Sequence, residues 1–281
     1  NTVNFHYPAT RQNTKNPVIC ISSRSERSGD GKHQGCCMKR HGDIFYKICA
    51  MENLREAHRN ARKDKLFYKE VKMVDQDPDK YLKEIQEMLL NDTYEVSEYT
   101  VSIINDKGKE RELEKLPYFP DRIIQWAIML QIEPIFMETF CTHTCAFIKD
   151  RGISKALELL HGYLEDVPGT QYCLKIDVRK FYPSIDHDIL KQLLARKIKD
   201  QRLLSLLYKI VDSVPGTGVP IGSYLSQYLA NFYLAYFDHY LKEELHQRYV
   251  VRYMDDIIIL SDSKEQLHEV RRKMGEYLET R

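Results

Sequence analysis

The chain has 281 residues, of which 43% are hydrophobic and 30% charged, and its formal net charge is +1. This composition is typical of a folded globular protein and excludes a disordered chain. No apolar run approaches the roughly 20 residues of a membrane-spanning helix, and no signal peptide is visible. The near-neutral charge predicts that any nucleic-acid surface is a local basic patch.

The cysteines favour a reducing compartment. Their number, seven, is odd, and the chain is long enough to fold without disulfides, so we expect a cytoplasmic protein. Cys141 and Cys145, with His143 between them, match no common zinc spacing, and we interpret them as packing residues.

Residues 1–50 are predicted to form a flexible or poorly structured arm. Residues 1–37 are rich in Ser, Asn, Arg and Gly and lack sustained periodicity. The sequence begins at Asn1, whereas Met38 and Met51 precede more structured stretches. We therefore hypothesise that natural translation starts at one of these two methionines.

Residues 51–170 are predicted to be mainly helical. A basic segment at 54–64 indicates a helix whose charges are either solvated or in contact with phosphate. Residues 101–116 have the pattern of a hairpin, and the apolar helix predicted at 121–140 must bend at Pro134. Further helices are expected from Asp77-Pro78 to Leu89 and at 153–163.

Residues 171–281 are predicted to form an antiparallel sheet with helices on one face, which is the α+β class. A glycine- and proline-rich loop at 215–222 precedes one long aromatic helix at 223–245. Helices at 187–213 are expected to join partly with the preceding unit. Strands are expected at 172–178, 249–253 and 257–260, helices at 187–198 and 202–211, and a last helix capped by Ser263.

Three carboxylates stand out by their context. Asp177 ends an apolar strand, where an unpaired charge is unfavourable, and Asp255 and Asp256 occupy the corner of an apolar hairpin. If these strands are neighbours, the carboxylates converge and repel one another unless a cation lies between them. Ligation by carboxylates alone favours a hard ion, so we expect Mg²⁺ or Mn²⁺. An ordinary turn is the alternative interpretation of the Asp-Asp pair.

These residues lie within a series of motifs that resembles the reverse transcriptases. The motifs fall in the family's order and spacing over residues 51–281. They are Asp121-Arg122 before Glu133-Pro134-Ile135-Phe136, then Lys175-Ile176-Asp177-Val178-Arg179-Lys180-Phe181-Tyr182-Pro183-Ser184-Ile185, then Gly218-Val219-Pro220-Ile221-Gly222-Ser223-Tyr224-Leu225-Ser226-Gln227 with Ala230-Asn231, and finally Tyr253-Met254-Asp255-Asp256. The resemblance implies a right-hand polymerase with fingers at 51–170 and palm at 171–281, lacking its thumb.

The resemblance also implies the catalytic residues. Asp177, Asp255 and Asp256 would be catalytic and, with Val178, would bind two Mg²⁺ ions. Asp186 and Asp188 are interpreted as helix-capping residues rather than ligands.

Five further residues would contact the incoming nucleotide: Lys109, Arg111, Tyr182, Ile221 and Gly222. Tyr182 matches the steric gate against ribonucleotides, and a core aromatic is its alternative. Lys109 and Arg111 would hold the triphosphate or be solvated hairpin charges, and Lys115 could replace Arg111. Arg122, Gln227, Tyr253 and Met254 would contact template or support the site, and a helix-capping role is the alternative for Arg122.

Two departures refine the resemblance. Ile221-Gly222 and Ser226-Gln227 stand where most reverse transcriptases have Gln-Gly and Ser-Pro. In these positions the motif resembles that of the error-prone enzymes of diversity-generating retroelements, which are found in bacteria and phages. Residues 147–152 also lack the Phe-Arg-Pro of the group II intron enzymes.

The expected function is therefore RNA-directed DNA polymerisation. The partners would be an RNA template, a DNA or RNA primer, deoxynucleotides and an accessory nucleic-acid-binding protein, with no membrane. A phage-defence reverse transcriptase and an RNA-binding intron maturase are the alternatives. An RNA polymerase is disfavoured because that family usually has Gly where Met254 stands.

Overall fold

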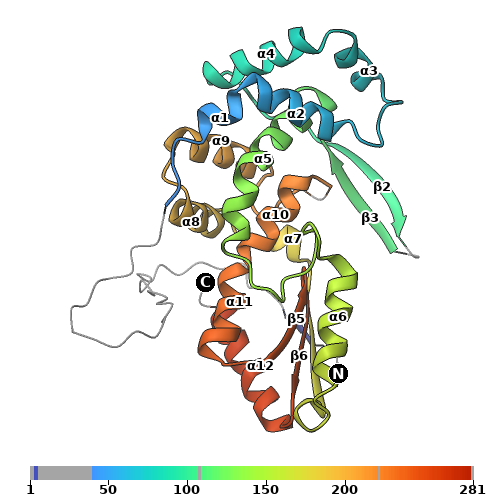
Figure 1. The fold of residues 1–281 in the computed structure, drawn as a ribbon, viewed down its shortest axis with the longest axis vertical. Helices are drawn as coiled ribbons and strands as arrows, with labels where there is room; N and C mark the ends of the chain where they lie inside the picture. The colour runs from blue at the N-terminus through green and yellow to red at the C-terminus, as the bar shows by residue number, and fades with distance from the viewer. Residues whose placement is uncertain (1–2, 6–39, 107–108, 221, 280–281) are drawn as a thin grey trace, which may run out of the picture.

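The computed structural model describes residues 3–5, 40–106, 109–220 and 222–279. In Figure 1 the helices of the first half of the chain lie at the top beside a hairpin, and a sheet lies below between α6 and α12. The helices are α1 Phe45–Cys49, α2 Met51–Ala61, α3 Lys69–Gln76, α4 Pro78–Leu90, α5 Ile123–Met137, α6 Gly152–Leu164, α7 Phe181–Ser184, α8 His187–Lys197, α9 Gln201–Asp212, α10 Tyr224–Tyr233, α11 Ala235–His239 and α12 Lys264–Glu279. The strands are β1 Val3–Phe5, β2 Thr100–Asp106, β3 Lys109–Lys115, β4 Tyr172–Val178, β5 Tyr249–Tyr253 and β6 Asp256–Ser261.

Among the helices of the upper part, α4 begins where local chemistry predicts. Asp77 caps α4 by accepting a hydrogen bond from the Lys80 backbone N–H at 3.3 Å, and Pro78 occupies the first turn. β2 and β3 pair in antiparallel register from Thr100–Lys115 to Asp106–Lys109, as predicted.

Helix α5 forms the central support between the upper and lower parts. Nine of its side chains are buried and Pro134 lies inside it, so it is apolar on nearly all sides, although it ends at Met137 rather than at 140 as predicted. Trp126 stacks on Tyr224 of α10 with ring centroids 4.5 Å apart. α10 carries the loop at 215–222, so this contact fixes that loop relative to α5.

The sheet has the strand order β1-β4-β6-β5, with β4, β6 and β5 antiparallel as predicted. Helices cover both faces, which corrects the prediction of one covered face. Val251 packs with Ala156 of α6 and with Cys145, which precedes that helix. Val250 packs in the main core, which includes Leu267 and Val270 of α12, and Figure 1 shows α6 and α12 on opposite sides of the sheet. Successive residues of β5 face opposite ways, so a strand that is buried throughout needs a helix on each side.

One other prediction is wrong. The long helix predicted at 223–245 is divided, because Leu234 (φ −91°, ψ −2°) ends α10 before α11 and a helical turn at Tyr240–Glu244. Apolar periodicity does not reveal such a break.

Most of the arm predicted at 1–50 lies outside the described residues, and the prediction stays open. In the described part, Val3–Phe5 pair in parallel with β4, and Phe45–Cys49 form a helix.

Helix α9 connects with the upper part. Arg202 donates hydrogen bonds to the Leu89 and Leu90 carbonyls of α4, and the Asp200 carboxylate accepts from the Ile44 and Phe45 backbone N–H groups. These contacts hold α9 against α4 and α1.

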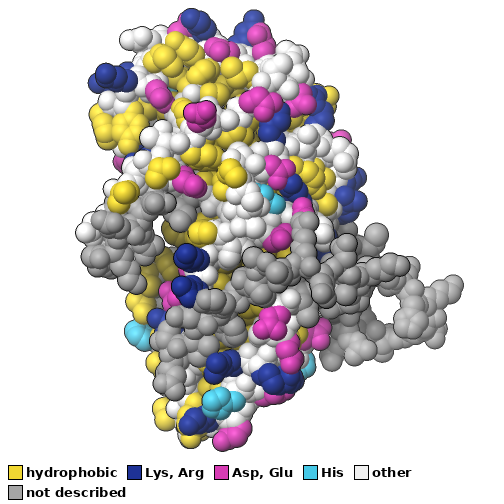
Figure 2. All heavy atoms as spheres, turned by 180° about the vertical axis from the view of Figure 1, so that it is seen from behind, with side chains coloured by type: hydrophobic (Ala, Val, Ile, Leu, Met, Phe, Trp, Pro, Cys, Tyr) yellow, Lys and Arg dark blue, Asp and Glu magenta, His cyan; other side chains and the backbone are white. Residues whose placement is uncertain are grey.

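The charges of both signs are mixed over the surface. On the face in Figure 2, acidic and basic side chains alternate, and hydrophobic side chains are interspersed over the upper part. Among the helices of the described ranges, none is both long enough and apolar enough to cross a bilayer.

Candidate catalytic site

The predicted carboxylates lie together at one end of the sheet. Asp177 of β4 and Asp256 of β6 are cross-strand partners, so their side chains emerge on the same face. Asp255 lies in the two-residue turn between β5 and β6, and its carbonyl accepts a hydrogen bond from the Val178 backbone N–H at 3.3 Å. This bond ties the turn to the strand that carries Asp177.

The turn itself is conformationally strained. Met254 has φ +58°, in a region that non-glycine residues rarely occupy, and its side chain is only 3% exposed. Such strain persists only where the surroundings hold the backbone in place, and it is often found at functional sites. Tyr253, the residue before Met254, is partly buried against the core.

A lysine shares this acidic strand end. The Lys175 ammonium lies 3.4 Å from the Asp256 carboxylate, and both side chains are about half exposed. Among the described residues, no three His, Cys, Asp or Glu side chains are gathered closely enough to hold a metal ion. The Asp256 carboxylate nevertheless has a positively charged neighbour, the Lys175 ammonium.

Tyr182, on helix α7, lies near the Asp255 carboxylate. Burial and the Asp255 carboxylate raise the pKa of its phenol well above the ordinary value, so the ring is neutral. The Tyr182 carbonyl accepts a hydrogen bond from the Val219 backbone N–H at 3.1 Å. This bond holds the loop at 215–222 against the turn that carries the phenol.

Gly218 makes that close approach possible. Its φ is +99°, and a Cβ atom at this position would lie 2.9 Å from the Pro183 Cα, which no side chain tolerates. The Gly218 carbonyl is 2.7 Å from the His187 ring, and its N–H donates to the Ile185 carbonyl at 2.8 Å.

Gly222 lies where the same loop approaches the hairpin. Its φ is +125°, and a Cβ atom there would be 3.5 Å from the Glu114 carbonyl of β3. Tyr182, Gly222 and β3 are thus linked through one loop. Ile221 and the side chains of Lys109 and Arg111 lie outside the described residues.

The remaining predicted residues take different positions. Gln227 is half-buried on α10, and Arg122 lies at the base of the hairpin, away from the carboxylates. Asp186 caps α8 by accepting a hydrogen bond from the Ile189 N–H at 3.0 Å, which confirms its capping role.

Sequence reasoning missed the group that holds the turn. Arg252 and Asp238 are both fully buried, and the guanidinium donates two hydrogen bonds of 2.7 Å to the carboxylate. The same guanidinium donates to the Met254 carbonyl at 2.9 Å and to the Asn231 side chain at 3.1 Å. Arg252 therefore joins α10 and α11 to the turn beside Asp255.

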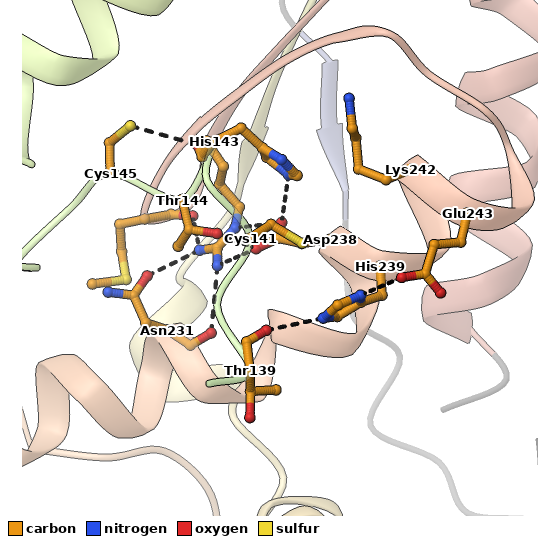
Figure 3. Close-up of polar contacts among 12 residues, drawn as sticks. Thr139, Cys141, His143, Thr144, Cys145, Asn231, Asp238, His239, Lys242 and Glu243 are labelled. Carbon is orange, nitrogen blue, oxygen red and sulfur yellow. Dashed lines mark hydrogen bonds and ion pairs between the residues drawn. The ribbon is translucent and has the colours of Figure 1, made fainter. Parts of the chain in front are cut away.

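Other contacts complete this group. Thr144 and His143 lie beside Asp238 (Figure 3), and Thr144 donates a hydrogen bond to it at 2.7 Å. The Arg252 backbone N–H donates to the His143 carbonyl at 2.9 Å. Burial alone would raise the pKa of the Asp238 carboxyl, but the Arg252 charge outweighs it and holds the pKa well below its ordinary value. A charged residue inside an apolar strand, at Arg252, was the signal available in the sequence.

We predict that Asp238→Asn lowers the free energy of unfolding by about 3–5 kcal/mol, because it leaves the Arg252 charge buried without a counter-charge. Urea denaturation monitored by circular dichroism would measure this change. Asp79→Asn is the matched control, since Asp79 pairs with Arg55 at 3.0 Å on the exposed surface and should contribute little. Equal losses in the two variants would contradict a special role for the buried pair.

Comparisons with known proteins agree with this arrangement. Residues 104–281 match the family described as "Reverse transcriptase (RNA-dependent DNA polymerase)". Protein YkfC of Escherichia coli is 30% identical over a region that covers 53% of this chain and 41% of that protein. The group II intron-encoded protein LtrA of Lactococcus lactis is 28% identical, over 45% of this chain and 22% of LtrA.

Two further similarities extend the comparison. Nuclear intron maturase 4, mitochondrial, of Arabidopsis thaliana is 25% identical over 73% of this chain and 26% of its own length. The solved structure of apo telomerase from Candida tropicalis, truncated from the C-terminal domain, has a TM-score of 0.44 and 14% identity, over 63% of this chain and 46% of that one. The chain thus spans less than half the length of these curated relatives. Because the family match covers more than half of the chain, this protein belongs to the reverse transcriptase family.

Proposed function

We propose that this chain is the fingers and palm of an RNA-directed DNA polymerase that extends a DNA or RNA primer on an RNA template. The observation that carries the proposal is the pairing of Asp177 with Asp256 next to the turn of Asp255. Neighbouring carboxylates repel one another, so their gathering at one strand end favours a bound cation. Family membership supports the same activity.

We propose that two Mg²⁺ ions, or Mn²⁺ in their place, bind at this strand end. Asp177, Asp255 and Asp256, with Val178, offer hard oxygen ligands, and Lys175 beside Asp256 indicates that this strand end favours positive charge. When bound, the ions would polarise the primer 3′-hydroxyl and stabilise the leaving pyrophosphate. Arg252 would keep the turn in place through its bond to the Met254 carbonyl.

The nucleotide would lie between the carboxylates and the hairpin. Tyr182 is beside Asp255, and its neutral phenol would occupy the space that a 2′-hydroxyl needs. Gly222 lies close to β3, where a larger side chain would narrow the gap. Lys109 and Arg111 on the same hairpin are proposed to bind the triphosphate.

We further propose that the enzyme is of the diversity-generating type and works in the cytoplasm with an accessory nucleic-acid-binding protein. Ile221-Gly222 and Ser226-Gln227 support this subtype. A role as an RNA-binding intron maturase is the second candidate, favoured by the names of the relatives LtrA and nuclear intron maturase 4.

Replacing Asp177 or Asp255 by Asn should lower polymerisation on the order of a thousandfold, because each variant loses a ligand that acts in the transition state. Primer extension by the purified protein on an RNA template measures the rate. Asp186→Asn is the control, since Asp186 only caps α8. Activity of the Asp177 or Asp255 variant within tenfold of wild type would rule out the proposed catalytic role and favour the maturase.

Tyr182→Ala should raise the use of ribonucleotides relative to deoxynucleotides, because the smaller side chain removes a clash with the 2′-hydroxyl. The ratio of kcat/KM for the two nucleotides is the measurement. Tyr208→Ala is a matched control, since this partly buried tyrosine lies on α9, outside the loop at 215–222. An unchanged ratio for Tyr182→Ala would make Tyr182 a core aromatic.

Ile221→Gln should reduce misincorporation, most of all opposite template adenine. A glutamine amide can form a hydrogen bond with a correctly placed nucleotide or template base. A misplaced one leaves polar groups unpaired, at a cost of about 1–3 kcal/mol each. Isoleucine forms no hydrogen bond, so it tolerates a displaced base pair. Sequencing of the DNA that both enzymes copy from one RNA template gives the error rates. An equal rate opposite adenine in the two enzymes would remove the support that Ile221 gives to the error-prone subtype.

A further inference from the structure

The basic side chains of the fingers fall into two groups. Those of α2 and the residues just after it are already held by partners within the protein, which favours the solvated interpretation of the basic segment at 54–64. The pairs are Arg55 with Asp79, Arg59 with Glu56, Arg62 with Asp75 and Lys63 with the Asn60 side chain. The three arginines are thus paired with carboxylates, and the Lys63 ammonium is hydrogen-bonded to a neutral amide.

The second group surrounds a cavity of about 370 Å³ at the base of the β2–β3 hairpin. Four cations line it: Lys65, Lys69, Lys115 and Arg122. Within the described part of the chain, none of the four forms an ion pair with a carboxylate. The acidic residue of the lining, Glu70, accepts a hydrogen bond from the Tyr118 backbone N–H instead.

Two of these cations, Arg122 and Lys65, are partly buried and lie close enough to repel each other. The Arg122 Nε is buried and lacks a hydrogen-bond partner among the described residues. Burial and the Arg122 charge lower the pKa of Lys65, so the two cations disfavour each other. An anion in the cavity would satisfy the Arg122 donor and relieve this repulsion.

Two exposed aromatic residues adjoin the cations along the chain. Phe67 is 70% exposed and Tyr68 is 45% exposed, and their rings lie 4.7 Å apart at 87°. Tyr68 also lines the cavity. Aromatic side chains left in water beside unpaired cations form the combination that binds unpaired bases and their phosphates.

We propose that this surface, which we call the fingers-base site (Lys65, Phe67, Tyr68, Lys69, Lys115 and Arg122), binds single-stranded RNA. A backbone phosphate lies in the cavity against Arg122 and Lys65, and an unpaired base stacks on Phe67 or Tyr68. Paired bases already stack on one another inside a duplex, so the site favours a single strand. The inference rests on the proposed function, because it supplies a contact for the RNA that the polymerase copies.

The test is fluorescence anisotropy of a labelled 12-nucleotide RNA at several salt concentrations, without metal or nucleotides. Lys65→Gln and Arg122→Gln should each weaken binding and reduce the slope of log affinity against log salt by about 0.7. Phe67→Ala should weaken binding about tenfold with the slope unchanged, because it removes stacking rather than charge. Arg55→Gln, which removes an exposed paired cation of the same part, is the control and should change little.

Three outcomes would overturn the proposal. They are unchanged binding in the Lys65 and Arg122 variants, an Arg55→Gln loss as large as theirs, and duplex RNA bound as tightly as the single strand. Circular dichroism of each variant checks that it remains folded. Asp255→Asn separates this inference from the proposed activity, because it should abolish extension yet leave RNA binding by the fingers-base site intact.

Discussion

The buried ion pair between Arg252 and Asp238 is the interaction on which the candidate site depends. Both side chains have no solvent exposure, so neither can lose its partner without leaving a charge in the protein interior. The guanidinium extends this constraint to the Met254 carbonyl and therefore to a turn with an unfavourable backbone conformation. The position of Asp255 is thus set by the core of the palm rather than by the turn's own preference.

The nucleotide side of the site is held differently. Tyr182 and the loop at 215–222 are joined by backbone hydrogen bonds, which form only because Gly218 has no side chain. Charge therefore fixes the turn of Asp255, whereas close backbone packing fixes the surroundings of Tyr182. A substitution in one half need not disturb the other.

Much of this architecture could be predicted from the sequence because its signals are local. The strand at Tyr172–Val178 and the caps Asp77 and Asp186 depend on residues that are close in the chain. The partners of Arg252 could not be found in this way, because they lie on two separate helices and only the fold brings them together. The break at Leu234 also escaped, since aromatic residues on all sides leave no periodic pattern to interrupt.

Which basic residues of the fingers are paired within the protein also could not be predicted from the sequence. Composition marked the segment at 54–64 as basic, but only the contacts distinguish cations that are paired within the protein from those left around the cavity at Arg122.

Lys175 provides the acidic strand end with a resident counter-ion. Its ammonium contacts Asp256 and lies on the strand that also carries Asp177. Repulsion between neighbouring carboxylates would otherwise oppose the pairing of the two strands. The amine therefore lowers the electrostatic cost of pairing β4 with β6. Because both side chains are about half exposed, water and salt screen this contact, so its contribution to stability is small.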